Sequence, residues 1–283
     1  MDEQNMDILE RIHASYYQLT VTEKRVADFV LTESDRVQFM SITQLAEECG
    51  TAEATISRFC RSLKLKGFNA FKIELARHSN PNKMKRVQNP PPDTPEGRFR
   101  EAGQQSVDAI SQTVGLMNPR TILRAVELIE NAPHVMCIGS GGSMIMASDC
   151  AHQFSTVTPK VYAVSDTHMQ MAACATMGVR DIIILFSYSG ATTNGIQILE
   201  LARQRGVKTI LVTRYNKSPA AKLADVVLLC GSNEGPFQFG SVPAKVAQLI
   251  VIDVLFREYY SRNILSSEDN VQRIASALSD MHV

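Results

Sequence analysis

Residues 41–61 read SITQLAEECGTAEATISRFCR, and this stretch decides how the N-terminal part of the chain is organised. Ser41 and Gln44 fit a capping box, in which each side chain bonds the backbone N–H of the other residue, so a helix is predicted to begin there. Gly50 is predicted to end that helix, because glycine adopts positive φ at little cost. A second helix is predicted over 54–63, where apolar residues recur at helical spacing. The stretch therefore predicts a helix, a sharp turn and a second helix.

Charge is distributed unevenly along the chain. Lys and Arg total 29, as do Asp and Glu, so the formal net charge is zero. Between residues 55 and 86, however, nine residues are basic and one is acidic. A basic helix after a tight turn is typical of elements that read DNA in the major groove, and a solvated basic face is the alternative. The predicted DNA contacts are Thr55 and Ser57 to bases or phosphates, Arg58 or Arg61 to guanine, and Lys64 and Lys66 to phosphates.

The totals fit a soluble protein of two domains. The chain has 283 residues, of which 45% are hydrophobic and 20% are charged. Its six cysteines include no C-x-x-C pair, which favours reduced thiols and a cytoplasmic location. No apolar run approaches the roughly 18 residues that span a bilayer, so no membrane association is expected. No group of residues has metal-ligand spacing, and we expect neither a metal nor a cofactor.

The second half of the chain has a different pattern. The stretch 79–97 holds five prolines and is predicted to be an interdomain linker, because proline restricts its predecessor and lacks a backbone donor. After it, short β-branched runs alternate with helical stretches, which predicts a parallel sheet covered by helices on both faces. The five predicted strands are 135–138, 161–164, 182–186, 209–212 and 226–229.

Two loops that follow predicted strands are candidates for a phosphate site. The first is the glycine turn Gly139–Ser143, where a ligand can approach the backbone closely and the next helix presents free N–H groups. The second is Ser187-Tyr188-Ser189-Gly190-Ala191-Thr192, which offers three hydroxyls at the start of a helix. The alternatives are a tight turn without a ligand for the first and helix capping alone for the second. Two such loops in one sheet favour ligand binding.

The chain resembles a known family. The run Thr22–Val30, the later run Ala54–Leu63 and the pair Gly67-Phe68 are similar to the N-terminal domain of RpiR-type transcriptional regulators. The second half resembles a SIS (sugar isomerase) domain, through its glycine turn and its Ser-x-Ser-Gly-x-Thr loop. The resemblance implies an all-α helix-turn-helix domain over 1–78, a linker and connecting helix start over 79–104, an α/β SIS domain with a five-stranded parallel sheet flanked by helices over 105–265, and a C-terminal tail over 266–283.

The resemblance also implies a function and a set of ligand contacts. Such regulators bind a double-stranded DNA operator as homodimers or tetramers, commonly control sugar-catabolism genes, and respond to a phosphorylated sugar. The residues that the resemblance places at the phosphosugar are Ser140, Gly141, Ser143, Ser187, Tyr188, Ser189 and Thr192.

Two other functions remain open at this point. The chain could be a phosphosugar isomerase or lyase with an accessory helical domain, although the only candidate acid or base beside the sugar is Glu234, which belongs to no clear motif. The helical domain could instead bind protein. We expect a regulator rather than an enzyme.

Overall fold

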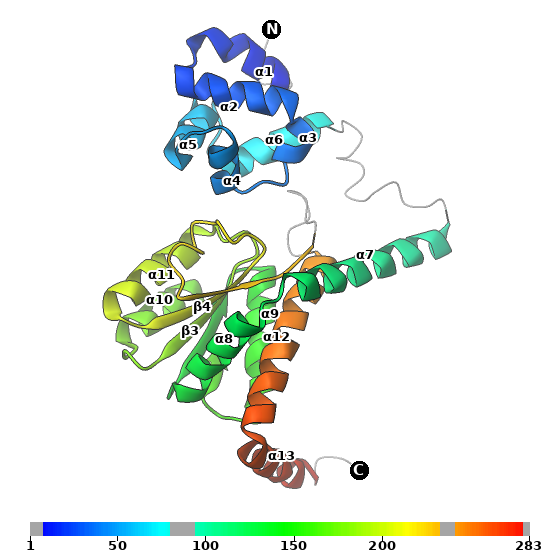
Figure 1. Cartoon of the computed structure of the whole chain (residues 1–283), viewed down its shortest axis with the longest axis vertical. Coiled ribbons are helices and arrows are strands. Elements are labelled where there is room, and N and C mark those ends of the chain that lie inside the picture. The colour runs from blue at the N-terminus through cyan, green and yellow to red at the C-terminus, as the bar shows by residue number, and fades with distance from the viewer. Residues whose placement is uncertain (1–7, 80–93, 233–240, 280–283) are drawn as a thin grey trace. The chain divides into compact units, whose positions relative to one another are not determined.

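The computed structural model describes residues 8–79, 94–232 and 241–279 (Figure 1). These residues divide into two compact units, one ending at Gln104 and one beginning at Gln105. Most of the predicted linker, residues 80–93, and the candidate acid Glu234 lie outside the described residues. The division falls inside a single helix, α7 (Pro95–Leu116), which begins with a proline at its first residue.

The N-terminal unit is all helical. Its core is formed by one apolar stripe from each main helix. Fully buried residues of this core include Ile12, Val26, Leu45, Phe59 and Phe71. Burying such stripes against each other is what makes short helices stable. The elements are α1 (Ile8–Ser15), η2 (Tyr16–Gln18), α2 (Val21–Thr32), α3 (Ser34–Val37), α4 (Ile42–Glu48), α5 (Glu53–Ser62) and α6 (Phe68–Ser79).

The predicted helix, turn and helix are present as α4 and α5. The capping box at the start of α4 is formed, with Ser41 Oγ accepting from the Gln44 N–H at 3.1 Å and the Gln44 side chain accepting from the Ser41 N–H at 2.9 Å. Gly50 has a φ of +59°, and this left-handed residue reverses the chain between the helices. Thr43 on α4 donates to the carboxylate of Glu53 on α5 at 2.8 Å. The angle between the two helices is therefore held by the turn and by a side-chain bond.

The C-terminal unit contains a sheet of five parallel strands in the order β2-β1-β3-β4-β5. Each strand lies within one residue per end of its predicted range. The strands are β1 (Val135–Gly139), β2 (Val161–Ala163), β3 (Ile182–Phe186), β4 (Lys208–Thr213) and β5 (Val226–Leu229). The helices are α7, α8 (Pro119–Asn131), α9 (Gly142–Ser155), α10 (Thr167–Thr176), α11 (Thr193–Arg205), α12 (Val242–Arg262) and α13 (Ile264–Leu278).

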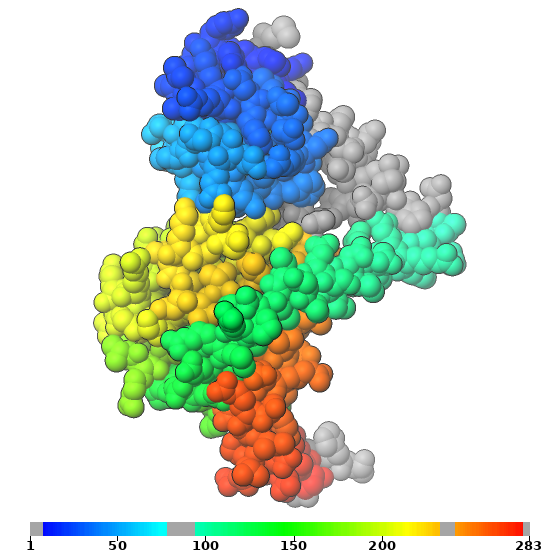
Figure 2. Space-filling view, viewed as in Figure 1, coloured from blue at the N-terminus to red at the C-terminus, as the bar shows by residue number. Residues whose placement is uncertain are grey.

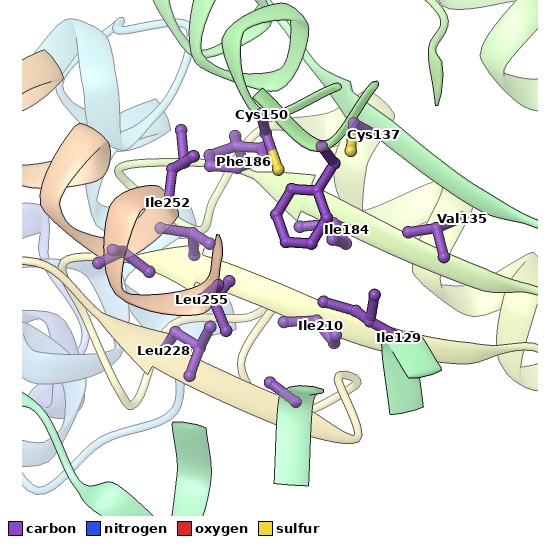
Figure 3. Packing of buried hydrophobic residues seen from close by; sticks show 14 of the residues in the cluster. Ile129, Val135, Cys137, Cys150, Ile184, Phe186, Ile210, Leu228, Ile252 and Leu255 are labelled. Atoms are coloured by element: carbon purple, nitrogen blue, oxygen red, sulfur yellow. The ribbon is translucent and has the colours of Figure 1, made fainter. Parts of the chain in front are cut away.

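Helices cover both faces of this sheet. On one face, side chains from α8, α9 and α12 pack on Cys137, Ile184 and Ile210, as Figure 3 shows. On the other face, α10 and α11 pack on Ile138 and Leu185 and their neighbours. Successive residues of one strand thus feed opposite cores, which is why these strands are continuously apolar instead of alternating. In the space-filling view, α7 and α12 are at the surface of this unit (Figure 2).

The sheet places the two candidate loops next to each other. The chain goes from β1 outward to β2 on one side and then returns to β3 on the other side of β1. At such a reversal the connections leave the two strands in opposite directions, and a crevice opens at their carboxyl ends. Gly139 and Phe186, which end β1 and β3, are paired in register. The loops that follow them therefore share this crevice.

Three further observations concern the sequence predictions. Helix α13 begins at Ile264, and most of it lies in the stretch 266–283 that the sequence predicts as a tail. All six cysteines are buried and none of them forms a disulfide, and burial raises the pKa of the Cys60 thiol to about 12. Across the described residues, no helix is both long enough and apolar enough to traverse a bilayer.

Candidate functional site

A hollow lies at the carboxyl ends of β1 and β3. It contains about 240 Å³ of space, part of which is open to solvent. Its floor is formed by the strand ends, including Leu185 and Phe186. None of the lining residues that the structure describes carries a charged side chain, so these residues would hold an anion by hydrogen bonds and helix dipoles. The polar side chains in its lining are Ser140, Ser143, Gln170, Ser187, Thr192 and Asn194.

The loop between β3 and α11 forms one wall of the hollow. Ser187 is buried, and its Oγ lies 3.4 Å from the Oγ1 of Thr192. Thr192 is the residue that precedes the first turn of α11, yet its side chain makes no capping hydrogen bond. The capping alternative raised by the sequence therefore does not account for this hydroxyl. The first N–H groups of α11 lack intrahelical partners, and Asn194 and Gly195 of that turn reach the hollow.

Gly190 gives this loop its shape. Its φ is +60°, and its N–H donates to the Ser187 carbonyl at 3.0 Å, which closes a tight turn. A Cβ at this position would lie 2.1 Å from Ser218 Oγ and 2.5 Å from Ser218 Cβ. Ser218 is itself fully buried, in the segment that follows β4. Gly190 is therefore needed both for its backbone conformation and for its lack of a side chain.

The glycine turn after β1 forms the opposite wall. Gly141 precedes α9 with a φ of +56°, and no side chain caps the start of this helix. Gly139 is packed so closely that a Cβ would lie 2.7 Å from the Ser143 carbonyl oxygen. This turn brings Ser140 and Ser143 to the hollow with the uncapped N-terminus of α9. The α11 wall thus combines hydroxyls with helix N–H groups that have no intrahelical partner, which is the arrangement that suits a phosphate. On the α9 wall the Ser143 and Met144 N–H groups donate to the Ser140 and Gly141 carbonyls at 3.2 and 3.0 Å, so this wall offers hydroxyls and the positive end of a helix dipole.

Three of the predicted ligand residues are not in the lining of this hollow. The Tyr188 hydroxyl donates to the Ser232 carbonyl and lies 2.7 Å from Ser232 Oγ. Its ring packs against the core on the α12 face, because side chains of an extended chain alternate in direction and Tyr188 follows Ser187. Ser189 Oγ accepts from the Ala191 N–H at 3.3 Å. Gly141 contributes the turn and no side chain. The lining of the hollow therefore contains fewer hydroxyl groups than the sequence predicted.

Two lining residues were missed by the sequence analysis. Gln170, on α10, is fully buried and donates through Nε2 to the carbonyls of Gly139 and Val164, both at 2.9 Å. Asn194, on α11, donates through Nδ2 to Gln170 Oε1 at 3.1 Å. Neither residue belongs to a glycine-rich or hydroxyl-rich motif, and a single amide on a helix gives no sequence signal. Only the fold shows that they meet at this site.

The N-terminal unit presents α5 with an apolar side in the core and a polar side outward. Arg58, Arg61, Lys64 and Lys66 are exposed, and Ser57 is half-buried. Thr55 differs from these predicted DNA contacts because it is buried, and its Oγ1 accepts from Arg58 Nη2 at 3.0 Å. In this structure Thr55 orients Arg58 and does not present its own hydroxyl to solvent.

Glu23 links this helix to the start of α2. Burial by itself would raise the pKa of its carboxyl. The hydrogen bonds from Thr20 and from Ser62 on α5, together with the nearby charge of Arg58, outweigh burial and hold that pKa below its ordinary value of 4.5. Glu23 is therefore ionised at neutral pH, and it ties the outer face of α5 to the rest of the unit.

Helix α5 ends in a Schellman motif with an unusual residue. The Leu65 N–H donates to the Cys60 carbonyl and the Lys64 N–H to the Arg61 carbonyl, and Lys64 has a φ of +59°. Glycine is the usual residue at this position because a Cβ is disfavoured there. Within the described residues, Lys64 is the only non-glycine with positive φ. Backbone strain of this kind is typical of positions kept for function.

Replacing Lys64 with glycine is expected to raise the free energy of unfolding of the N-terminal unit by about 0.5–1 kcal/mol, because glycine adopts this conformation without strain. The same variant should bind duplex DNA more weakly, since it loses a positive charge. Calorimetric unfolding and a DNA titration measure the two effects. The matched control is Lys66→Gly, which loses the same charge at a position without positive φ. A Lys64→Gly variant no more stable than this control would contradict the strain argument.

Comparison with known proteins identifies both halves of the chain. A family model described as a SIS domain matches residues 128–257, and one described as a helix-turn-helix domain of the rpiR family matches residues 6–82. An HTH-type transcriptional regulator from Caldanaerobacter subterraneus is 32% identical over 252 residues, covering 88% of this chain and 89% of its own. The chain belongs to the RpiR family of transcriptional regulators.

Two further relatives extend this RpiR assignment. The HTH-type transcriptional regulator HexR from Escherichia coli is 28% identical, covering 97% of this chain and 95% of its own. The NanR protein of Vibrio vulnificus, whose structure is a complex with ManNAc-6P, is 27% identical with a TM-score of 0.86, covering 98% of this chain and 100% of its own. The predicted family and the predicted two-part fold class are confirmed. The domain limits at 78, 105 and 265 stay predictions.

Proposed function

We propose that this RpiR-family chain is a DNA-binding transcriptional regulator of sugar-catabolism genes, controlled by a phosphorylated sugar held in the hollow between β1 and β3. The observation that carries the proposal is the combination of hydroxyls and two helix N-termini around one hollow at the strand reversal. The hydroxyls of Ser187 and Thr192 are the central phosphate contacts, with Ser140 and Ser143 on the opposite wall. The ManNAc-6P complex of the related NanR supports a phosphosugar as the class of effector.

DNA binding is assigned to the exposed face of α5. Arg58 and Arg61 reach base edges in the major groove, Ser57 contacts bases or phosphates, and Lys64 and Lys66 neutralise phosphates. A homodimer or tetramer in the cytoplasm would place two such helices on a palindromic operator. The effector acts by binding one arrangement of the two helices more tightly than the other, because a ligand shifts an equilibrium only by its difference in affinity for the two states.

The rival function is a phosphosugar isomerase or lyase. Either reaction needs an acid or a base beside the sugar carbons. Among the described residues, the lining of the hollow offers amides and hydroxyls but no carboxylate, histidine or lysine, and the candidate Glu234 lies outside those residues. This composition supports effector binding over turnover and, with the regulator names of the relatives, a non-enzyme.

A two-step experiment tests the proposal. A thermal-shift screen of sugar phosphates on the full chain identifies compounds that raise the unfolding temperature, because a ligand specific for the folded state stabilises it. Duplex DNA selected from a random-sequence pool by binding to the full chain is then titrated with and without the best compound at several salt concentrations. We expect salt-sensitive DNA binding that the compound changes. Turnover of sugar phosphates without DNA binding would instead establish the enzyme.

Removing the Ser187 hydroxyl is expected to weaken sugar phosphate binding by about 10- to 150-fold, the equivalent of one hydrogen bond to a charged oxygen, about 1.5–3 kcal/mol. Isothermal titration calorimetry of Ser187→Ala measures the loss. Ser189→Ala is the matched comparison, since the Ser189 hydroxyl accepts from the Ala191 N–H and is not in the lining of the hollow. A loss in Ser189→Ala as large as in Ser187→Ala would contradict this assignment of the phosphate contacts.

A further inference from the structure

The side chain of Gln170 has only one possible amide orientation. It bridges the carbonyl oxygens of Gly139 and Val164, at the carboxyl ends of β1 and β2, with 2.9 Å to each. A carbonyl oxygen only accepts hydrogen bonds, so the group that faces both of them must be the NH₂ of Gln170. Both hydrogens of Nε2 are used in this way. The oxygen Oε1 is therefore fixed on the opposite side, toward α11.

This orientation fixes a second amide. Asn194 approaches Gln170 Oε1 at 3.1 Å, and because Oε1 only accepts, the approaching atom must be Nδ2. The oxygen Oδ1 of Asn194 is then on the side of the amide that faces away from Gln170. Asn194 lines the hollow and is half-buried, and within the described part of the chain no group donates to Oδ1. The backbone carbonyls of the sheet thus determine the orientation of Gln170, and Gln170 in turn determines the orientation of Asn194. As a result, the Asn194 Oδ1 faces the hollow as a hydrogen-bond acceptor.

We propose that Asn194 selects the ligand by accepting a hydrogen bond from a hydroxyl or N–H group near its phosphoryl group, and that Gln170 is the positioning residue that makes Asn194 an acceptor. This inference rests on the proposed function, since it assumes that the hydroxyls hold a phosphoryl group. The dianion of a phosphate ester has only acceptor oxygens and gains nothing from Oδ1. The partner must therefore be a donor on the carbon skeleton. A site with both hydroxyls for the phosphoryl group and the acceptor Oδ1 for the carbon skeleton binds phosphorylated polyols and sugars better than phosphate esters without hydroxyls.

A matched pair of small probes tests this selection. Glycerol 3-phosphate carries hydroxyls beside its phosphate ester, and n-propyl phosphate has the same length without them. Competition calorimetry on the full chain should give wild type a preference of about 2- to 12-fold for glycerol 3-phosphate, the value of one net hydrogen bond. Asn194→Ala should bind both probes equally, with the affinity that wild type has for n-propyl phosphate. Asn131→Ala, an exposed asparagine at the end of α8, should keep the preference.

The role of Gln170 has its own readout. Gln170→Leu should also abolish the preference, and adding it to Asn194→Ala should not change the ratio of the two affinities any further. A purely structural role for Gln170 would lower stability and both affinities and leave their ratio unchanged, and that result overturns the positioning role. If wild type binds inorganic phosphate and both esters but Asn194→Ala keeps the preference, the selection by Asn194 is wrong while the phosphate site stands. If wild type binds no phosphorylated probe or sugar phosphate, the proposed function fails and this inference with it.

Discussion

Substituting Gly190 with alanine is expected to abolish binding of sugar phosphates and to destabilise the C-terminal unit by about 2–5 kcal/mol. A left-handed conformation costs an L-residue about 1–2 kcal/mol, and overpacking adds about 1–3 kcal/mol. The new Cβ would lie 2.5 Å from the Cβ of Ser218, which is buried. Either the loop that contains Gly190 or the segment that contains Ser218 therefore has to move. Either movement displaces Ser187 and Thr192 from each other.

Thermal unfolding and calorimetric titration of Gly190→Ala measure both losses. The matched control is Gly178→Ala, because a Cβ there meets only Asp181 Oδ2 at an ordinary 3.5 Å and the φ of Gly178 is not positive. This control should unfold and bind like the wild type. A Gly190→Ala variant with wild-type affinity would show that the geometry of this loop does not determine phosphate binding.

The second large effect concerns Arg58. Replacing it with alanine is expected to reduce discrimination between operator and unrelated DNA by about 5- to 150-fold, since one bidentate arginine–guanine contact supplies about 1–3 kcal/mol of specificity. Arg58 is exposed on α5 and is held by the buried hydroxyl of Thr55. Binding of sugar phosphates should be unchanged, because Arg58 lies in the other unit.

A competition titration with operator and non-operator duplexes measures the loss. Arg36→Ala is the matched control: Arg36 is an exposed arginine of the same unit, but it lies on α3 and pairs with Glu48 at 2.6 Å. Its substitution should leave discrimination intact. Unchanged discrimination in Arg58→Ala would refute the assignment of α5 and would favour the interpretation of the helical unit as a protein-binding module.

The sequence predicted those features that depend on neighbouring residues. The capping box of Ser41 and Gln44 and the reversal at Gly50 were predicted because each is decided within four residues. The strands were predicted because buried parallel strands are continuously apolar. The two loops at the hollow were found because glycines and hydroxyls after a strand are a local pattern.

The sequence predicted the side chains of the site less well. It placed Tyr188 with the serines around it, but the pleat of an extended chain turns Tyr188 toward Ser232. It placed Thr55 at the DNA, but Thr55 lies on the buried side of α5. It gave no sign that Lys64 adopts a glycine conformation, because lysine carries no such preference.

By itself, the sequence determined the family, the two kinds of domain and the positions of the strands, since hydrophobic period, caps and glycines act over a few residues. Only the tertiary structure decided what surrounds the hollow. Gln170 contacts Gly139 from 31 positions away and Asn194 from 24 positions away. These contacts exist because the strand order places β3 beside β1, with β2 on the far side, and the order is set by the packing of both faces of the sheet. The polarity of the amide at Asn194 follows from that order, because it derives from the carbonyls that end β1 and β2.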